Sequence, residues 1–517
     1  MNNIISKEYE FVNEPILTYE EGSKEREDLI KTYLQMKEEF VEIPLIIGGK
    51  EIKTDKTGKC VLPHNHKHEI GKYYLAGKEE ATMAIEAALE AKEEWENIPW
   101  LEKKAIFLRA AELAAGPWRN RLNAATMLTQ SKTYKQAEID SACELVDFIK
   151  FNVKALHDIY SEQPLSTRTS INRIEYRPLE GFIFAVSPFN FTAIGSNLVG
   201  APAIAGNTVV WKPASSQVYT AYVVYQLFKE AGVPDGVINF IPCSSRDIGT
   251  TIIDHEDLAG IHFTGSTEVF QNMWQTVGEN IRNYNNFPRL VGETGGKNYV
   301  IAHKSADLKS LAKLLVEGAF EYQGQKCSAA SRAYIPKGLW DEFKVELDKE
   351  MDKVKMGDVE DFNNFMAAVI DRSSFENIKS YVDYAKSSDE AEIIYGGNLD
   401  DSIGYFVEPT IILTSNPKFK TMVEEIFGPV LTIYLYEDDK YDEVLELANE
   451  TSEYGLTGSI FARCRQAIIK AEKVLNHSAG NFYINDRPTG AVVGQQPFGG
   501  GRLSGTNDKA GSRLNMQ

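Results

Sequence analysis

Closely spaced cysteines are missing from this sequence. There are 5 cysteines among 517 residues, and no two of them form a C-x-x-C pair. Structural zinc sites and disulfide frameworks need regular, short cysteine spacings. We therefore expect no metal site and reduced thiols, and reduced thiols favour a cytoplasmic protein.

Long apolar runs and an excess of basic residues are missing as well. No window reaches the roughly 18 apolar residues of a membrane span, and the longest candidate, residues 198–211, is interrupted by proline, glycine and asparagine. The formal net charge is -19. Nucleic acids and anionic membranes bind basic surfaces, so we expect neither as a partner. The acidic N-terminus resembles neither a secretory signal nor an Arg-rich transit peptide, which also favours the cytoplasm.

The predicted elements indicate an α/β protein. At roughly 100–200 residues per domain, this chain length corresponds to two or three domains. Residues 79–98 and 140–159 have the apolar spacing of helices. Short apolar runs that predict strands then alternate with helical stretches, at 181–187, 208–211, 237–241 and 260–263. This alternation predicts a parallel sheet that binds ligands at the carboxyl ends of its strands.

Two further segments complete this organisation. Residues 299–436 alternate in the same way and contain Cys327, so we predict a second α/β domain there. Residues 161–176 are polar and rich in Ser, Thr and Arg. They predict a linker or a protruding arm.

Four loops after predicted strands contain residues suited to ligand binding, and each has an ordinary alternative. The loops are 187–191, 211–215, 263–267 and 291–298. Free N–H groups at a helix N-terminus suit an anion, and glycines allow close backbone approach. The alternatives are a helix cap for Asn190, a solvated side chain for Lys212, a capped turn for Gly265 and Ser266, and an exposed turn for Glu293.

Cys327 lies in the motif GQKCS. Most lone cysteines are small buried hydrophobic residues, and this alternative stands for Cys327 taken in isolation. We keep it for the four other cysteines, Cys60, Cys143, Cys243 and Cys464, which have no glycine-rich loop beside them.

In their order along the chain, these motifs resemble the aldehyde dehydrogenase superfamily. The motifs are SPFN, WKPA, FTGS, GETGGKN, GQKCS, EEIFGPV and QQPFGG. Longer segments are similar to the branch that oxidises L-glutamate γ-semialdehyde in proline degradation, namely FNFTAIGSNL, FPRLVGETGGKN, FEYQGQKCSAASR and NFYIND.

The resemblance implies a fold of two Rossmann-like α/β domains with a small β oligomerisation arm. Residues 1–160 and 181–295 would form the NAD-binding domain, and residues 296–504 the catalytic domain that contains Cys327. Residues 161–180 would form the arm, together with the C-terminal residues 505–517. A homodimer or a larger homo-oligomer is expected.

The resemblance also implies residue roles. Cys327 matches the nucleophile, Asn190 an oxyanion donor, and Glu293 the base that activates water. NAD is the expected cofactor, and NADP is the alternative because Ser215 stands where NAD-specific relatives often have Glu. The matched cofactor residues are Ser187, Lys212, Gly265, Ser266, Glu425 and Phe427.

For the substrate, the resemblance implies contacts from residues that are far apart in the chain. Consecutive backbone N–H groups of Gly490 and Ala491 would bind the substrate carboxylate as an anion nest. The other matched residues are Ser328, Phe191, Phe498 and Glu144, and for Glu144 a structural salt bridge is the alternative.

Three other functions stay open at this point. A different aldehyde could be the substrate. A γ-glutamyl phosphate reductase needs no water-activating Glu, so the GETGG loop argues against it. A cysteine-dependent acyl hydrolase would be favoured by a histidine beside the cysteine, and none of the 8 histidines lies in these loops.

Overall fold

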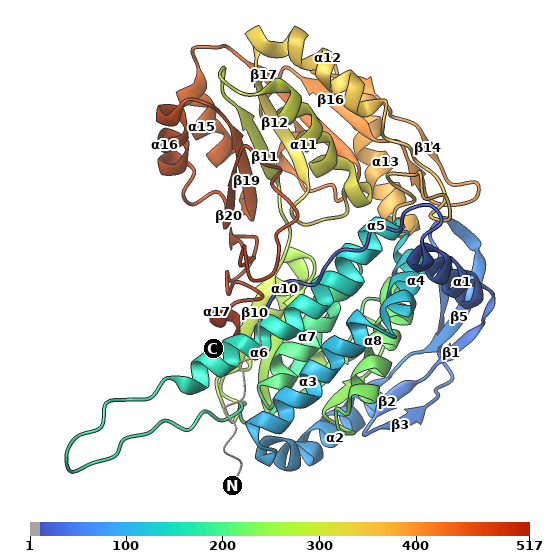
Figure 1. The fold of residues 1–517 in the computed structure, drawn as a ribbon, viewed down its shortest axis with the longest axis vertical. Helices are drawn as coiled ribbons and strands as arrows, with labels where there is room; N and C mark the ends of the chain where they lie inside the picture. Colours follow the sequence, from blue (N-terminus) through green and yellow to red (C-terminus); the bar gives the residue numbers. More distant parts are fainter. Residues whose placement is uncertain (1–10) are drawn as a thin grey trace.

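A seven-stranded sheet organises the first half of the chain in this computed structural model, which describes residues 11–517 (Figure 1). Its order is β10-β9-β6-β7-β8-β2-β3, and the strands from β10 to β8 are parallel. The bounds are β2 Leu45–Ile47, β3 Lys50–Ile52, β6 Phe182–Val186, β7 Thr208–Lys212, β8 Ile238–Phe240, β9 Leu258–Thr264 and β10 Arg289–Glu293. The apolar runs predicted as strands are therefore confirmed. Strand β6 is buried along its whole length, as expected for a parallel strand with both faces covered.

Helices cover both faces of this sheet. They are α2 Lys78–Asn97, α3 Trp100–Ala115, α4 Arg119–Gln130, α5 Tyr134–Ala137, α6 Leu145–Ser161, α7 Thr192–Ile204, α8 Val218–Ala231, α9 Ser245–Ile253 and α10 Thr267–Glu279. The prediction at 79–98 is confirmed by α2. The predicted helix at 140–159 begins as a π-helix, Glu138–Glu144, and continues as α6. Single π-turns inside helices are frequent at functional sites.

A second seven-stranded sheet forms the other lobe, at the top of Figure 1. Its order is β13-β16-β17-β12-β11-β19-β20, and only the edge strand β13 is antiparallel to its neighbour. The strands are β11 Asn298–Ala302, β12 Ala330–Pro336, β13 Ala391–Tyr395, β16 Thr410–Thr414, β17 Val430–Tyr436, β19 Thr457–Phe461 and β20 Asn481–Ile484. The helices are α11 Leu308–Phe320, α12 Trp340–Met351, α13 Arg372–Lys386, α14 Lys420–Val423, α15 Tyr441–Glu450 and α16 Arg465–Val474. The sheet thus extends beyond the predicted alternation at 299–436.

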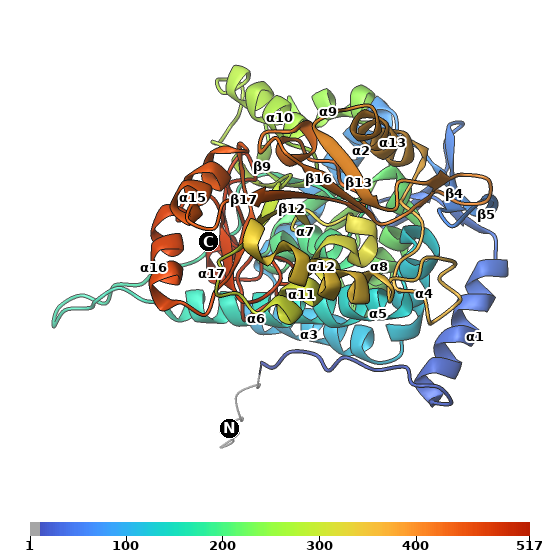
Figure 2. The same ribbon diagram turned by 90° about the horizontal axis from the view of Figure 1, so that it is seen from above.

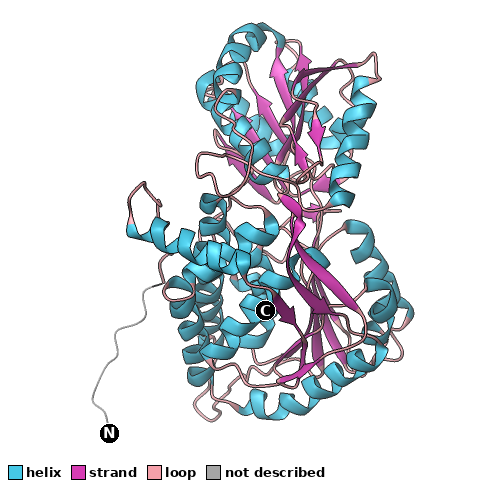
Figure 3. Ribbon diagram, turned by 90° about the vertical axis from the view of Figure 1, so that its right-hand side faces the viewer, coloured by secondary structure: helices cyan, strands magenta, loops and turns pink. Residues whose placement is uncertain are grey.

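The two sheets meet end to end. Strand β10 ends at Glu293 and β11 begins at Asn298, so residues 294–297 alone connect them. Figure 3 shows the strands of both sheets arranged as one column between layers of helices. The carboxyl end of β10 therefore lies beside the amino end of β11, and the functional residues gather at this junction.

Smaller sheets brace the two lobes. A three-stranded sheet, not predicted above, has the order β1-β5-β4, with β1 Val41–Ile43, β4 Thr57–Leu62 and β5 Asn65–Tyr74. Backbone bonds connect its hairpin to the second lobe, from His66 N to the Ile403 carbonyl (3.0 Å) and from Tyr405 N to the Pro63 carbonyl (3.0 Å). Two-stranded pairs join β14 Leu399–Asp400 to β15 Phe406–Val407, and β18 Tyr454–Gly455 to β21 Gly501–Arg502. The remaining helices are α1 Lys24–Glu38 and α17 Arg513–Met516.

The predicted arm protrudes from the molecule after α6 (Figure 2). Residues 162–180 contain no strand in this single chain, although the resemblance implied a β arm. An isolated two-stranded hairpin is at best marginally stable in water, and Leu165 and Ile171 are 92% and 91% exposed here. Arg513 of the C-terminal segment forms an ion pair with Glu162 at the base of the arm.

Within residues 11–517, no helix combines the length and the apolar character needed to cross a membrane.

Candidate active site

The first sheet supplies one side of the site from neighbouring strand ends. Ser187 and Asn190 follow β6, Lys212 ends β7, Gly265 follows β9 and Glu293 ends β10. These four strands are adjacent and parallel, so their carboxyl ends share one edge. This edge is where the sequence predicted ligand-binding loops.

Cys327 comes from the amino end of the second sheet, just before β12. The turn that leads to it contains three residues with left-handed φ angles, Tyr322 (54°), Gln323 (55°) and Gly324 (65°). A side chain at Gly324 would lie 2.3 Å from the Gly428 carbonyl, so the turn requires glycine. This turn leaves Cys327 half-buried, in contrast to the fully buried Cys60, Cys143 and Cys243.

Carboxylates surround the thiol of Cys327. Burial raises the pKa of this thiol strongly, and the negative charges of Glu293, Glu425 and Glu144 raise it further. The backbone N–H of Ser328 acts in the opposite direction. The thiol is therefore protonated at rest. Its neighbouring carboxylates and its half-buried position distinguish Cys327 from Cys60 and Cys143, and its role as a nucleophile stays a prediction. Cys464, also predicted to be buried, is half-buried instead.

Glu293 does not lie in an exposed turn, so that alternative is wrong. Burial raises the pKa of its carboxyl group well above the usual value. The backbone N–H of Gly500 and the charge of Lys509 lower it, and Asp508 raises it. One carboxyl oxygen, Oε2, is buried and has no hydrogen-bond partner among the described residues. An unpaired buried oxygen is available to bind a water molecule.

The side chain of Asn190 is buried. It points toward the cysteine loop, residues 325–329, which contains Cys327. Its Nδ2 donates a hydrogen bond to the Gln325 carbonyl at 3.0 Å. The alternative role as a helix cap is wrong, because Asp140 accepts hydrogen bonds from the first N–H groups of α7, those of Thr192 and Ala193 (both 2.9 Å). Asn190 therefore keeps a second side-chain N–H for a ligand.

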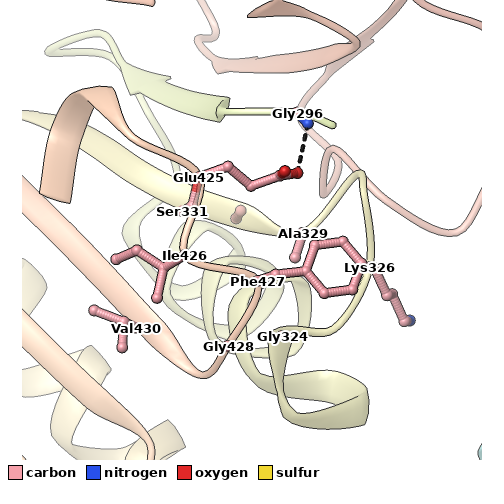
Figure 4. Close-up of a pocket in the computed structure, with 11 residues that line it drawn as sticks. Gly296, Gly324, Lys326, Ala329, Ser331, Glu425, Ile426, Phe427, Gly428 and Val430 are labelled. Atoms are coloured by element: carbon pink, nitrogen blue, oxygen red, sulfur yellow. Dashed lines mark hydrogen bonds between the residues drawn. The ribbon is translucent and has the colours of Figure 1, made fainter. Parts of the chain in front are cut away.

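Glu425 and Phe427 line a pocket beside the cysteine loop (Figure 4). Oε1 of Glu425 accepts a hydrogen bond from the Gly296 N–H at 2.7 Å. Burial raises the pKa of Glu425 to about 7, although the hydrogen bond from Gly296 and the positive charge of Lys297 lower it. A Cβ atom on Gly295 would lie 2.4 Å from the other carboxyl oxygen. The ring of Phe427 packs edge-on against Phe189, with centroids 5.7 Å apart.

Three other predicted cofactor residues, Ser187, Ser266 and Gly265, already have structural partners. Ser187 Oγ accepts a hydrogen bond from Trp211 Nε1 at 2.9 Å. Ser266 accepts one from the Val269 N–H (3.4 Å) as the N-cap of α10, so the capped-turn alternative describes its side chain. The Gly265 N–H donates to the Glu293 carbonyl at 3.2 Å, which links β9 to β10.

One contact joins two of the predicted substrate segments. Ser328 Oγ lies 2.7 Å from Thr489 Oγ1, so the segment before Gly490 and Ala491 is tied to the residue after the cysteine. Gly490 has a φ of 87°, a conformation that favours glycine. The backbone of Phe498 pairs with Ala510 in an antiparallel bridge.

Lys132 is buried beside two half-buried predicted substrate residues, Phe191 and Glu144. The Nζ of Lys132 lies 4.0 Å from the Phe191 ring centroid and forms an ion pair with Asp140 at 2.6 Å. The ion pair of this region is thus made by Asp140 and not by Glu144. Burial and the charge of Asp140 raise the pKa of Glu144 to about 8.

Several residues of this junction have no signal in the sequence. Asp140 lies in a stretch that predicts only a helix, Lys132 lies outside the predicted elements, and Lys509 lies far along the chain from Glu293. Their proximity to the site depends on the packing of α6, α7 and the C-terminal segment.

Relatives with high similarity cover almost the whole chain. The Dictyostelium discoideum protein "Delta-1-pyrroline-5-carboxylate dehydrogenase, mitochondrial" is 50% identical over 98% of this chain and 91% of its own length. The Homo sapiens protein of the same name is 48% identical over 96% of this chain and 89% of its own length. The Mycobacterium tuberculosis Delta-pyrroline-5-carboxylate dehydrogenase, solved with NAD bound, superposes with a TM-score of 0.95 at 45% identity, over 100% of this chain and 95% of that one.

The cytoplasmic location predicted from the sequence is contradicted by these relatives. The Dictyostelium and human proteins are named mitochondrial, which points to mitochondria instead. The prediction relied on reduced thiols, but Cys60 and Cys143 are buried. Buried thiols that form no disulfide stay reduced in either compartment, so they do not identify one.

The family is established by the sequence as a whole. The signature of the Aldehyde dehydrogenase family matches residues 51–516, a span that includes every motif and both sheets described above except for strand β2 and the first residue of β3. The chain belongs to the aldehyde dehydrogenase family.

Proposed function

We propose that this chain oxidises L-glutamate γ-semialdehyde, the open form of 1-pyrroline-5-carboxylate, to L-glutamate with NAD, as the second step of proline degradation. Relatives named for this substrate, at about 50% identity over nearly the full length, support the substrate. The observation that carries the chemistry is the convergence of the Cys327 thiol and the Glu293 carboxylate at the junction of the two sheets.

Cys327 is the proposed nucleophile. Its thiol loses a proton to solvent or to a neighbouring carboxylate, and the thiolate attacks the aldehyde carbon. The negative charge that develops on the aldehyde oxygen is stabilised by the free side-chain N–H of Asn190 and by the backbone N–H of Cys327. Such donors act most strongly in a site that excludes water.

The cofactor would lie along the edge of the first sheet. When bound, NAD accepts the hydride that leaves the aldehyde carbon. We propose that Glu425 holds the nicotinamide ribose and Phe427 packs beside the ring, while Lys212, Ser187, Gly265 and Ser266 line the rest of the groove. The absence of a Cβ at Gly295 suits this arrangement, because it leaves space for the Glu425 carboxylate.

Glu293 is the proposed base for the second half of the reaction. A water molecule held by its unpaired Oε2 gives a proton to the carboxylate and attacks the thioester carbon. The thioester bond breaks, and L-glutamate and the Cys327 thiol are released. Burial raises the pKa of this carboxyl group, and a higher pKa makes the ionised carboxylate a stronger base for this proton.

We assign substrate selection to the predicted substrate residues near Ser328. The N–H groups of Gly490 and Ala491 would bind the α-carboxylate with the hydroxyl of Ser328, and Phe191 and Phe498 would enclose the aliphatic chain. Glu144 stands beside this space, and with a pKa of about 8 it is largely protonated at neutral pH.

We also propose a division into domains and an assembly of the chain. We propose a cofactor domain of residues 1–160 and 181–295, of which 1–10 lie outside the described residues, and a catalytic domain of 296–504. The exposed apolar side chains of the arm, residues 161–180, together with 505–517, would contact a second subunit in a homodimer or larger homo-oligomer. Size-exclusion chromatography with light scattering, before and after deletion of residues 163–175, tests this assembly.

The decisive assay compares 1-pyrroline-5-carboxylate with a panel of simple aldehydes and follows NADH formation. We expect a clear preference for the former, and loss of all turnover in Cys327→Ala. Cys464→Ala is the matched control and should retain activity, because this thiol stands at the N-cap of α16 and its hydrogen bond goes to Gln466, which is not a proposed site residue. Equal rates on all aldehydes would reject the proposed substrate, and NAD-independent ester hydrolysis without dehydrogenase activity would favour the acyl hydrolase.

A further inference from the structure

We propose that Lys509 is a positioning residue that holds Glu293 in place and keeps its carboxylate ionised for attack on the thioester. This inference rests on the base role proposed for Glu293 above.

The backbone at Glu293 is clamped by the C-terminal segment 503–506. Thr506 donates its N–H to the Gly292 carbonyl at 2.9 Å, and its hydroxyl accepts the Gly292 N–H at 3.0 Å. Glu293 itself forms an antiparallel bridge with Gly505. Gly505 has a φ of 140°, and a Cβ there would lie 2.4 Å from the Gly292 carbonyl. The end of β10 therefore depends on this segment for its position.

Lys509 follows this segment by three residues, and its side chain contacts the backbone beside the Glu293 carboxyl group. Its Nζ donates to the carbonyls of Gly480 (2.8 Å) and Gly499 (2.9 Å). A Cβ on Gly499 would lie 2.9 Å from Oε1 of Glu293, so the carboxyl lies directly against this glycine. The ammonium group and the carboxylate thus flank one glycine, and Lys509 fixes the backbone that supports the base.

Lys509 also affects the ionisation of Glu293 through its positive charge. Lys509 and the Gly500 N–H favour the ionised carboxylate, whereas burial and the negative charge of Asp508 disfavour it. The Cys327 thiol also faces Glu293, and it is neutral at rest. The interaction is mutual, because burial lowers the pKa of Lys509 and the charge of Glu293 partly offsets this effect. The charge of Lys509 therefore counteracts the effect of burial on the ionisation of Glu293.

The test compares Lys509→Met, which removes the charge at similar size, with Lys509→Arg, which retains it. We expect Lys509→Met to keep the first-turnover burst of NADH but to lose steady-state rate. The acidic limb of the pH profile for thioester hydrolysis should move up by about one pH unit, which lowers the rate about tenfold below that limb. Lys509→Arg should restore the limb to near its original position.

Lys103→Met is the matched control. Lys103 also donates to two backbone carbonyls, those of Glu96 (3.0 Å) and Ile98 (2.8 Å), but at the end of α2. We expect this variant to lose thermal stability without a change in the pH profile. If Lys509→Met is insoluble, Lys509→Gln replaces it, since an amide can still donate to a carbonyl without a charge.

The result that overturns the inference is an unchanged acidic limb in the charge-removing variant, with only a loss of stability like that of Lys103→Met. Failure of the proposed function is a separate result, because it would be visible as the absence of activity on 1-pyrroline-5-carboxylate in the unmodified chain. If another aldehyde proves to be the substrate, the same pH profiles measured with it still decide the role of Lys509.

Discussion

The side-chain amide of Asn190 donates a hydrogen bond to the carbonyl of Gln325, at 3.0 Å. Asn190 follows β6 of the first sheet, and Gln325 lies two residues before Cys327 in the second lobe. This one bond therefore connects the cofactor side of the site to the nucleophile loop. It also orients the remaining N–H of the amide.

Replacement of Asn190 tests its role as an oxyanion donor. We expect Asn190→Ala to lower kcat roughly 10²–10³-fold, the usual cost of one such donor, with a much smaller change in the KM for NAD. Steady-state kinetics with 1-pyrroline-5-carboxylate provides the measurement. A loss below tenfold would exclude the amide from transition-state stabilisation.

Replacement of Glu293 should separate the two halves of the reaction. Glu293→Gln cannot accept the proton of the attacking water, so we expect a retained NADH burst followed by steady-state turnover reduced by roughly 10²–10⁴-fold. Stopped-flow measurement of NADH distinguishes this from a loss of both phases. In the unmodified chain, the rate of thioester hydrolysis should fall as pH drops through the raised pKa of Glu293.

The same substitution should stabilise the fold at neutral pH. A carboxyl group whose pKa is raised by folding opposes folding above its unfolded pKa, and this cost disappears when pH falls below that value. Glu293→Gln should therefore raise Tm at pH 7, by roughly 1 °C per kcal/mol for a chain of 517 residues, and leave it unchanged near pH 3. Calorimetry at the two pH values is the check, and a lower Tm at pH 7 would contradict it.

Gly295 offers a test of the cofactor side. In Gly295→Ala the new methyl group would lie 2.4 Å from Oε2 of Glu425 and displace this flexible carboxylate from the Gly296 N–H. We expect the KM for NAD to rise about tenfold, equivalent to one charge-assisted hydrogen bond of roughly 1.4 kcal/mol. Gly278→Ala in α10 is the control, because a Cβ there meets nothing within 4 Å. Equal KM values in both variants would remove Glu425 from the cofactor site.

Cofactor choice can be tested at Ser215, which is exposed three residues after Lys212. Ser215→Glu would place a carboxylate where the 2′-phosphate of NADP is expected, and like charges in contact cost several kcal/mol. We expect activity with NADP to fall at least about tenfold while activity with NAD is maintained. Ser215→Gln, of the same size without the charge, is the control. A parallel loss of activity with NAD would show that Ser215 does not mark the phosphate position.

Much of the first sheet could be predicted because its strands are short and apolar throughout. Strands β6, β7 and β9 have this character, and a parallel strand covered by helices on both faces requires it. The sheet β1-β5-β4 was missed because β5 reads NHKHEIGKYY and lacks an apolar pattern. The cap of α7 was also missed. It comes from Asp140, more than fifty residues earlier in the chain, so that local sequence rules do not reveal it.

The order of strands, helices and reactive loops was determined by the sequence alone, since hydrophobic periodicity and turn residues act over a few neighbouring positions. The tertiary structure decided which of these loops meet. Cys327, Glu293, Glu425, Glu144 and Lys509 come from five separate segments, and their protonation depends on burial and on charges across space. These effects follow distance in the folded molecule, and separation along the chain does not predict them.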